Sequence, residues 1–208
     1  MSDSPIMVPL PSGFHDQRFV AAQKAVGHKR PWEAITGITL HQTACDFGHE
    51  SPDRWNTLEA HMGVSRERFG VWVHDLEWIV FHANELNPMT VGLEIEGNYP
   101  GVAGDRATCW QPGSDLMVPT PGLVPVAHDA IRWICEMVKA NGGQVEHLYA
   151  HRQTAGSRRA DPGEDLWKMV ALPMMSELGL DDGGPAFRID NGRVIPEAWN
   201  PVYVGNPY

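Results

Sequence analysis

A histidine and an aspartate lie at the two ends of the segment AHRQTAGSRRADPG, residues 150–163. His151 follows the strand-like run VEHLY, and a second histidine, His41, follows the strand-like run ITGITL. Strand ends beside loops are where functional side chains gather. Two imidazoles and the carboxylate of Asp161 suit Zn²⁺, and three protein ligands leave a fourth position open for water. Spacing alone leaves one alternative open, in which these are ordinary hydrogen-bonded histidines.

Two glutamates stand in the run VGLEIEG, residues 91–97. The alternation places Glu94 and Glu96 on one face of an expected strand, opposite the face of Val91, Leu93 and Ile95. Buried carboxylates need a partner or a task. A glutamate near a zinc-bound water could act as a general base. The alternative is a solvated strand face.

The elements that would position these groups follow from apolar periodicity. We expect strands at 35–44, 91–97 and 145–151, a hairpin at 69–83, and helices at 15–26, 51–64, 125–143 and from Gly163 through Met169 with a disturbance at Pro173. Strands interleaved with helices predict a single α/β domain, in which helices flank a mixed central β-sheet.

Two irregular segments stand out beside these elements. Residues 98–125 are rich in proline and glycine and too long for a simple connection, which predicts a functional or lid-like loop. The tail at 183–208 is rich in proline, with a possible small hairpin around Asn191 and Gly192. We therefore expect the catalytic domain at 1–182 and the tail to pack on it or extend from it.

Composition excludes several classes of function. The chain has 208 residues, 42% of them hydrophobic, and a formal net charge of −10. This length suits one domain with a sizeable core. The acidic balance argues against a nucleic-acid partner, because no basic stripe is present to neutralise phosphates. The three cysteines, Cys45, Cys109 and Cys135, are too widely spaced for a Cys-x-x-Cys metal site or a disulfide framework, so we expect reduced thiols.

No charged and apolar signal pattern opens the chain, and no run of about 18 apolar residues occurs in it. We therefore expect a protein that is made in the cytoplasm without a signal peptide and has no transmembrane segment.

Four motifs together carry a family resemblance: TLHQTA at 39–44, FHA at 81–83, VGLEIEG at 91–97 and AHRQTAGSRRADPG at 150–163. In this order they resemble the zinc-dependent N-acetylmuramoyl-L-alanine amidases, which share a fold with the peptidoglycan recognition proteins. The resemblance covers roughly residues 35–170. The His-to-Asp segment combined with the Gly-x-Glu-x-Glu-Gly strand is its most specific part.

The resemblance implies a role for individual residues. It implies that His41, His151 and Asp161 bind Zn²⁺ and that Glu94 activates the zinc-bound water. Arg159 falls where many members have a lysine that stabilises the oxyanion, although a guanidinium differs in geometry from an ammonium. His82 falls where the family often has a histidine that contacts substrate.

Three further residues have less specific signals. For Arg158, beside Arg159, we favour a solvated loop tip. His61 could line the cleft, although an ordinary buried histidine is the favoured reading. Trp110, in the long loop, could stack on a sugar face or simply pin the loop.

The resemblance implies a zinc amidase that hydrolyses the amide between N-acetylmuramic acid and the L-alanine of a peptidoglycan stem, and we expect a monomer. A phage or prophage endolysin, which acts on the cell wall once released, is the favoured setting. A cytoplasmic enzyme that recycles muropeptides, or a delivered toxin, fits the same residues. The alternative from another class is a module that binds peptidoglycan without cutting it.

Overall fold

The computed structural model describes residues 4–18, 26–47, 51–113 and 115–208, and its centre is a mixed six-stranded sheet. The strands are β1 (Phe14–Asp16), β3 (Gly37–Gln42), β4 (Met62–Val64), β5 (Gly70–Trp72), β7 (Thr90–Ile95) and β8 (His147–Ala150), in the order β1-β5-β4-β7-β3-β8. Strand β3 runs parallel to both β7 and β8, and only the β4–β5 pair is antiparallel within this sheet. The predicted mixed central sheet is confirmed.

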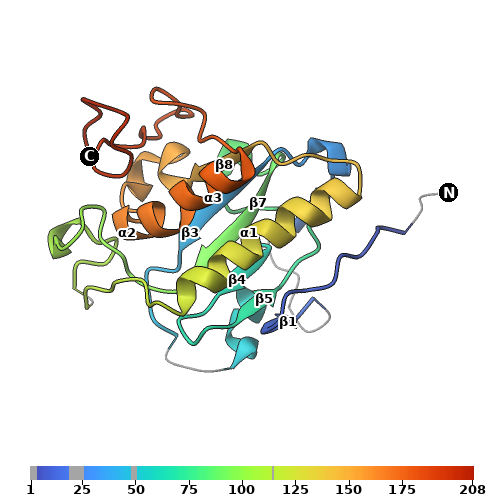
Figure 1. Cartoon of the computed structure of the whole chain (residues 1–208). Helices are drawn as coiled ribbons and strands as arrows, with labels where there is room; N and C mark the ends of the chain where they lie inside the picture. The colour runs from blue at the N-terminus through green and yellow to red at the C-terminus, as the bar shows by residue number, and fades with distance from the viewer. Residues whose placement is uncertain (1–3, 19–25, 48–50, 114) are drawn as a thin grey trace.

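Helices cover one face of this sheet. Figure 1 shows α1 (Leu123–Ala140) crossing in front of the strands, with α2 (Glu164–Leu166) and α3 (Leu172–Leu178) beside it. The buried stripe of α1 includes Ile131, Ile134 and Val138, as expected of an amphipathic helix. A π-helical turn at Trp167–Ala171 joins α2 to α3 just before Pro173, which has no N–H for the helix ladder. The helices predicted at 125–143 and after Gly163 are therefore confirmed.

The predicted hairpin at 69–83 is wrong in its pairing. Its two strands exist, but β5 pairs with β1 and β4, whereas β6 (Trp78–Val80) pairs with β2 (Val26–Lys29) in a separate two-stranded sheet. The backbone N–H groups of Val73 and His74 donate to the carbonyl of His61, although Trp78 N closes a turn on the carbonyl of Asp75. Hydrogen bonds to a distant segment thus separate the two strands.

The helix predicted at 51–64 is also wrong, and the helix predicted at 15–26 is wrong at its two described ends. In the region predicted as a helix at 15–26, residues 15 and 16 lie in β1 and residue 26 lies in β2, whereas residues 19–25 lie outside the described part. In the region 51–64, a 3-10 helix spans Pro52–Thr57, and the chain then becomes extended at Leu58 and enters β4. Gly63 of β4 lies so close to the ring of the buried Trp55 that a Cβ on it would be 2.1 Å from a ring carbon, so glycine is what admits the ring.

The C-terminal tail contributes to the main core, since Ile195 and Trp199 are fully buried in it. No strand forms around Asn191 and Gly192, so the predicted small hairpin is wrong and a simple turn takes its place. All three cysteines are free thiols. Within the described part of the chain, no helix is long and apolar enough to span a bilayer.

Candidate metal centre

The ends of two parallel neighbouring strands bring two histidines together. His41 lies near the end of β3, and His151 directly follows β8, which pairs with β3. The Nδ1 atoms of the two rings are 2.9 Å apart, and His151 Nδ1 is 2.9 Å from Asp161 Oδ2. One potential ligand atom from each of the three buried residues lies within 4.8 Å of the others. Two imidazole nitrogens and a carboxylate oxygen are donors that Zn²⁺ prefers, so the residues fit this ion.

A hydrogen-bond chain sets the orientation of His41. Its Nε2 lies 3.0 Å from His82 Nδ1, and His82 Nε2 lies 3.4 Å from the carbonyl of Thr90. Burial lowers the pKa of His82 to about 3 and, together with the neighbouring His151 and His82, lowers the pKa of His41 well below its ordinary value. Both rings are therefore neutral, with one N–H each.

The tautomers of both rings follow from this chain. The carbonyl of Thr90 can only accept, so His82 donates from Nε2 and accepts at Nδ1. His41 must then donate from Nε2, which leaves the lone pair of its Nδ1 directed at His151 and Asp161. A ligand whose second nitrogen is fixed in this way is oriented for a metal ion. His82, which was expected to contact substrate, thus also hydrogen-bonds to the candidate ligand His41 and orients it.

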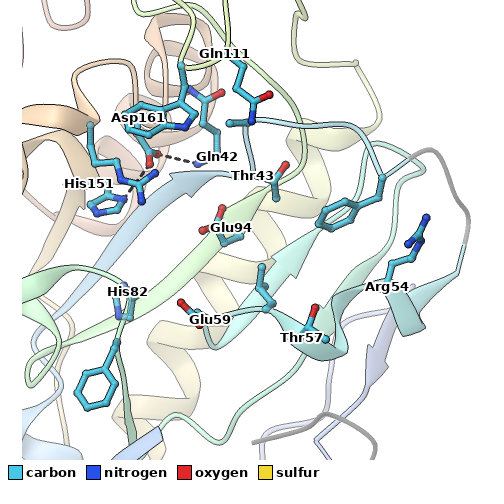
Figure 2. Close-up of a pocket in the computed structure, with 16 residues that line it drawn as sticks. Gln42, Thr43, Arg54, Thr57, Glu59, His82, Glu94, Gln111, His151 and Asp161 are labelled. Atoms are coloured by element: carbon cyan, nitrogen blue, oxygen red, sulfur yellow. Dashed lines mark hydrogen bonds and ion pairs between the residues drawn. The ribbon is translucent and has the colours of Figure 1, made fainter. Parts of the chain in front are cut away.

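Gln42 fixes the position of Asp161 and carries no signal of its own in the sequence beyond its place after His41. Its backbone N–H donates to Asp161 Oδ1 at 2.9 Å, which leaves Oδ2 facing His151. Its side-chain amide donates to the carbonyls of Tyr99 and Ala160. One residue therefore ties β3 to the loop that delivers the carboxylate (Figure 2).

Glu94 faces the same centre from β7. It lies opposite His41 in the β3–β7 register, and its Oε1 is 4.0 Å from His41 Nδ1. Only 18% of the side chain is exposed, and Oε2 has no hydrogen-bond partner among the described residues. Burial, followed by the negative charge of Asp161, raises the pKa of Glu94 well above its ordinary value, and Arg158 opposes that rise. Figure 2 shows its carboxylate in the pocket, where it can exchange a proton.

Glu96 has a different environment although it is only two residues away. It is buried, and its carboxylate accepts hydrogen bonds from Phe47 N, Ser65 Oγ and Arg66 N. These bonds join two loops to the end of β7. Its lone pairs are engaged, so it has a structural environment and does not line the pocket.

The structure reverses the expected orientation of the two arginines. Arg158 lines the pocket, with its guanidinium 4.4 Å from the centre of the Trp110 ring. Arg159 instead lies over Tyr208, 5.8 Å from the ring centre. Arg158 ends a 3-10 turn, in which successive side chains diverge by about 120°. Of these two arginines, Arg158 is therefore the one at the pocket, and the solvated position expected for it is wrong.

A pocket of about 500 Å³ opens beside the three candidate ligands. Trp110 and Gln111 of the long loop line it, as do Arg54, Thr57 and Glu59. Figure 2 shows Gln111 beside Asp161 and Gln42, and Arg54 on the far side of the pocket from His151. Trp110 is thus where a cleft residue was expected. His61 is not in the lining, because it is fully buried and both of its ring nitrogens bond to backbone groups. The favoured expectation of an ordinary buried histidine therefore holds, and the alternative place at the cleft is wrong.

A second hollow of about 320 Å³ adjoins the first and shares Phe81, His82, His151 and Arg158 with it. Asn84, Asn87 and Ser157 give this hollow a neutral polar lining. Phe81 is 54% exposed at the junction. The candidate metal centre therefore lies where two hollows meet, as suits a bond with a substituent on each side.

A protein-family model matches the chain. The Amidase_2 model, described as N-acetylmuramoyl-L-alanine amidase, matches residues 31–164, which is well over half of the chain. The match includes both histidines, Glu94 and Asp161. No curated protein sequence matches the chain significantly.

Solved structures share the fold at low sequence identity. The endolysin N-acetylmuramoyl-L-alanine amidase LysCS from Clostridium intestinale aligns with a TM-score of 0.56 and 13% identity over 83% of this chain and 98% of its own. Drosophila peptidoglycan recognition protein SD aligns at 0.52 and 13% over 79% and 94%, and Drosophila PGRP-LB at 0.50 and 16% over 74% and 89%. These structures establish the architecture of the chain and nothing about its chemistry.

Proposed function

The chain belongs to the N-acetylmuramoyl-L-alanine amidase family, and from this premise we propose that it is a zinc-dependent hydrolase. The bond it cuts is the amide between N-acetylmuramic acid and the L-alanine of the stem peptide. The observation that carries the proposal is the buried convergence of His41, His151 and Asp161 beside a glutamate with an unpartnered oxygen. A module that only binds peptidoglycan has no need of such a set.

Zinc, when bound by these three residues, would polarise the amide carbonyl and lower the pKa of a bound water to about 7. The residues of the chain supply the rest of the chemistry. Glu94 accepts a proton from the attacking water, and its raised pKa allows it to deliver that proton to the departing amine of L-alanine. The C–N bond breaks, the hydroxyl oxygen of the water stays on the acyl product as part of a carboxylate, and the proton goes to the amine of L-alanine.

Arg158 is the residue that can stabilise the negative charge on the carbonyl oxygen during this attack. Its guanidinium lies at the pocket wall, near enough to lower the pKa of His41 and to oppose the rise in the pKa of Glu94. Stacking against Trp110 holds it in place. A fixed donor at a developing oxyanion is among the largest contributions an enzyme makes.

The two hollows offer room for both sides of the scissile bond. Aromatic rings pack well on the apolar faces of sugars, and Phe81 and Trp110 both line the larger hollow. We assign these rings to contacts with the substrate. Peptidoglycan or a soluble muropeptide is therefore the proposed substrate, and a monomer is the proposed form.

For the biological setting we propose lysis from within, in which the protein acts on the cell wall after release from the cytoplasm. The fold is shared with a clostridial endolysin, which is compatible with this setting. Recycling of soluble muropeptides is the second candidate, and the same chemistry would serve it.

The test combines metal analysis with product analysis. We expect about one Zn²⁺ per chain, and release of free stem peptides beginning with L-alanine from intact sacculi, as identified by mass spectrometry. Zinc-loaded protein that binds sacculi and releases no peptide would refute the amidase proposal in favour of a binding module. Cleavage of soluble muropeptides without cleavage of sacculi would favour recycling.

A further inference from the structure

The C-terminal tail runs beside the turn that carries His151. Ile189 N donates to the carbonyl of Gln153 at 2.8 Å, and Arg193 N donates to the carbonyl of Arg152 at 2.8 Å. Gly192 approaches this turn so closely that a Cβ on it would lie 2.0 Å from the Gln153 carbonyl oxygen. The turn therefore has a tightly fitted backbone partner, which lies outside the family match at 31–164.

Arg152 links this turn to the loop that carries Asp161. Its backbone N donates to the carbonyl of Asp161 at 3.0 Å, and its Nη1 donates to the carbonyl of Arg159 at 2.7 Å. The side chain is completely buried, and no hydrogen-bond partner for Nε or Nη2 is found in the described part of the chain. A buried guanidinium with two unpaired nitrogens needs some other stabilisation.

Two aromatic rings of the tail provide that stabilisation. The guanidinium carbon of Arg152 lies 4.7 Å from the ring centre of Trp199 and 5.2 Å from that of Tyr208. Both distances are within the range of cation–π attraction, which strengthens when the cation is removed from water. The tail therefore holds Arg152 by its charged group.

The same two rings also bind the long loop. Trp199 Nε1 donates to the carbonyl of Gly101 at 2.6 Å, and the Tyr208 hydroxyl donates to the carbonyl of Thr108 at 3.2 Å. A Cβ on Gly101 would collide with the Tyr208 hydroxyl, so glycine is what admits the ring. Figure 1 shows the C-terminal segment, in red, folded back toward this loop, in green.

We propose that residues 189–193, Trp199 and Tyr208 form a C-terminal strap that positions the metal ligands through Arg152. Trp199 and Tyr208 are positioning residues, since they act on His151 and Asp161 only through Arg152 and the backbone around it. The inference rests on the proposed metal site, and it assigns the tail to the working unit of the enzyme.

Tyr208 gives the sharpest test. Tyr208→Ala removes the ring from Arg152, whereas Tyr208→Phe keeps the ring and loses only the hydroxyl bond to Thr108. Tyr203→Ala is the matched control, because Tyr203 is a half-buried tyrosine of the same tail whose hydroxyl bonds to Asp182 instead. Each variant is assayed as the full chain for zinc affinity by chelator competition, for kcat and KM, and for amide hydrogen exchange at residues 151–161.

We expect Tyr208→Ala to bind zinc about tenfold more weakly, as is typical when a residue supporting a metal ligand is lost. Its kcat should fall with little change in KM, and exchange at 151–161 should accelerate. Tyr208→Phe and Tyr203→Ala should resemble the wild type in zinc affinity and in exchange.

Unchanged zinc affinity and unchanged exchange in Tyr208→Ala would overturn the strap. Equal losses in Tyr203→Ala would also overturn it, because general loosening of the tail would then explain the effect. If the wild type binds no zinc, the proposed function fails, and exchange at 151–161 still decides whether the strap orders this turn. Tyr208→Leu, which keeps apolar bulk without a π face, replaces Tyr208→Ala if the latter does not fold.

Discussion

Two buried histidines of this protein, His41 and His61, have opposite roles. In the candidate metal centre, His41 keeps the lone pair of one nitrogen directed at His151 and Asp161. Outside this centre, His61 accepts a hydrogen bond from Gly92 N at 2.9 Å through Nδ1 and bonds to the Trp78 carbonyl at 2.8 Å through Nε2. His41 therefore has a nitrogen lone pair available for a metal ion, and His61 has none.

The same contrast separates Glu94 of β7 from Glu96, which directly follows this strand. Glu94 has an unpartnered oxygen at the pocket, whereas Glu96 accepts bonds from three donors and joins loops. Residue type and burial alone therefore do not distinguish a reactive group from a structural one. The distinction lies in which polar atoms remain unengaged after folding.

The largest expected effect comes from removing His41, and His61 is the matched comparison. His41→Ala should reduce zinc affinity by more than the roughly 10–100-fold typical of residues that support a ligand, and cleavage should fall to background. His61→Ala should leave the zinc affinity of the folded protein unchanged but lower the free energy of unfolding by about 3 kcal/mol, because two backbone groups lose their partner in a new cavity. Metal titration and urea unfolding separate the two outcomes. Loss of zinc binding in folded His61→Ala would contradict the purely structural role given to His61.

The next largest effect concerns the two glutamates. Glu94→Gln should keep zinc and lower kcat by about 10²–10⁴-fold, because general acid–base catalysis is lost. In the metal-free protein at neutral pH it should also stabilise the fold, since the raised pKa means that folding disfavours the ionised form.

Glu96→Gln should do the reverse. It should preserve kcat per folded molecule and lower the free energy of unfolding by about 1–3 kcal/mol, because an amide replaces a carboxylate that accepts three hydrogen bonds. Single-turnover assays and unfolding curves measured on both variants test the pair. Wild-type turnover in Glu94→Gln would remove this residue from the mechanism.

A smaller effect is expected for the neighbouring arginines. Arg158→Ala should lower kcat by about a hundredfold through loss of a donor to the oxyanion, with zinc retained. Arg159→Ala should lower it much less, because its guanidinium faces Tyr208 and not the pocket. Steady-state kinetics on the two variants compare them directly, and a larger loss in Arg159→Ala would restore the expectation from sequence.

The smallest effect is a change in pH dependence. Burial, followed by the charge of Arg30, lowers the pKa of His61 well below its ordinary value. The folded protein therefore keeps His61 neutral, whereas the unfolded chain takes up a proton below about pH 6.5. The free energy of unfolding should then fall as pH decreases from about 6.5, by up to about 1.4 kcal/mol per pH unit for this residue.

His61→Gln should reduce the slope of unfolding free energy against pH by the contribution of one proton, about 1.4 kcal/mol per pH unit, whatever its overall effect on stability. Urea unfolding of the metal-free protein at several pH values between 5 and 8 measures it. An unchanged slope would mean that His61 is protonated in the folded protein and not held neutral as its hydrogen bonds require.

The sequence by itself determined the local features. Alternating apolar residues predicted β3, β7 and β8, and the period of α1 predicted its buried stripe, because each pattern depends only on near neighbours in the chain. The histidines near two strand ends and the motif order also pointed to His41, His151 and Asp161. Parallel pairing of β3 and β8 then made their convergence possible.

Only the tertiary structure decided what depends on distant partners. It separated β5 from β6, buried His61 with both ring nitrogens bonded to backbone groups, and turned Arg158 rather than Arg159 toward the pocket. It also brought Trp199 and Tyr208 against Arg152 from the far end of the chain. The physical reason is that a side chain acquires its role from the groups that engage or spare its polar atoms, and those groups come from elsewhere in the sequence.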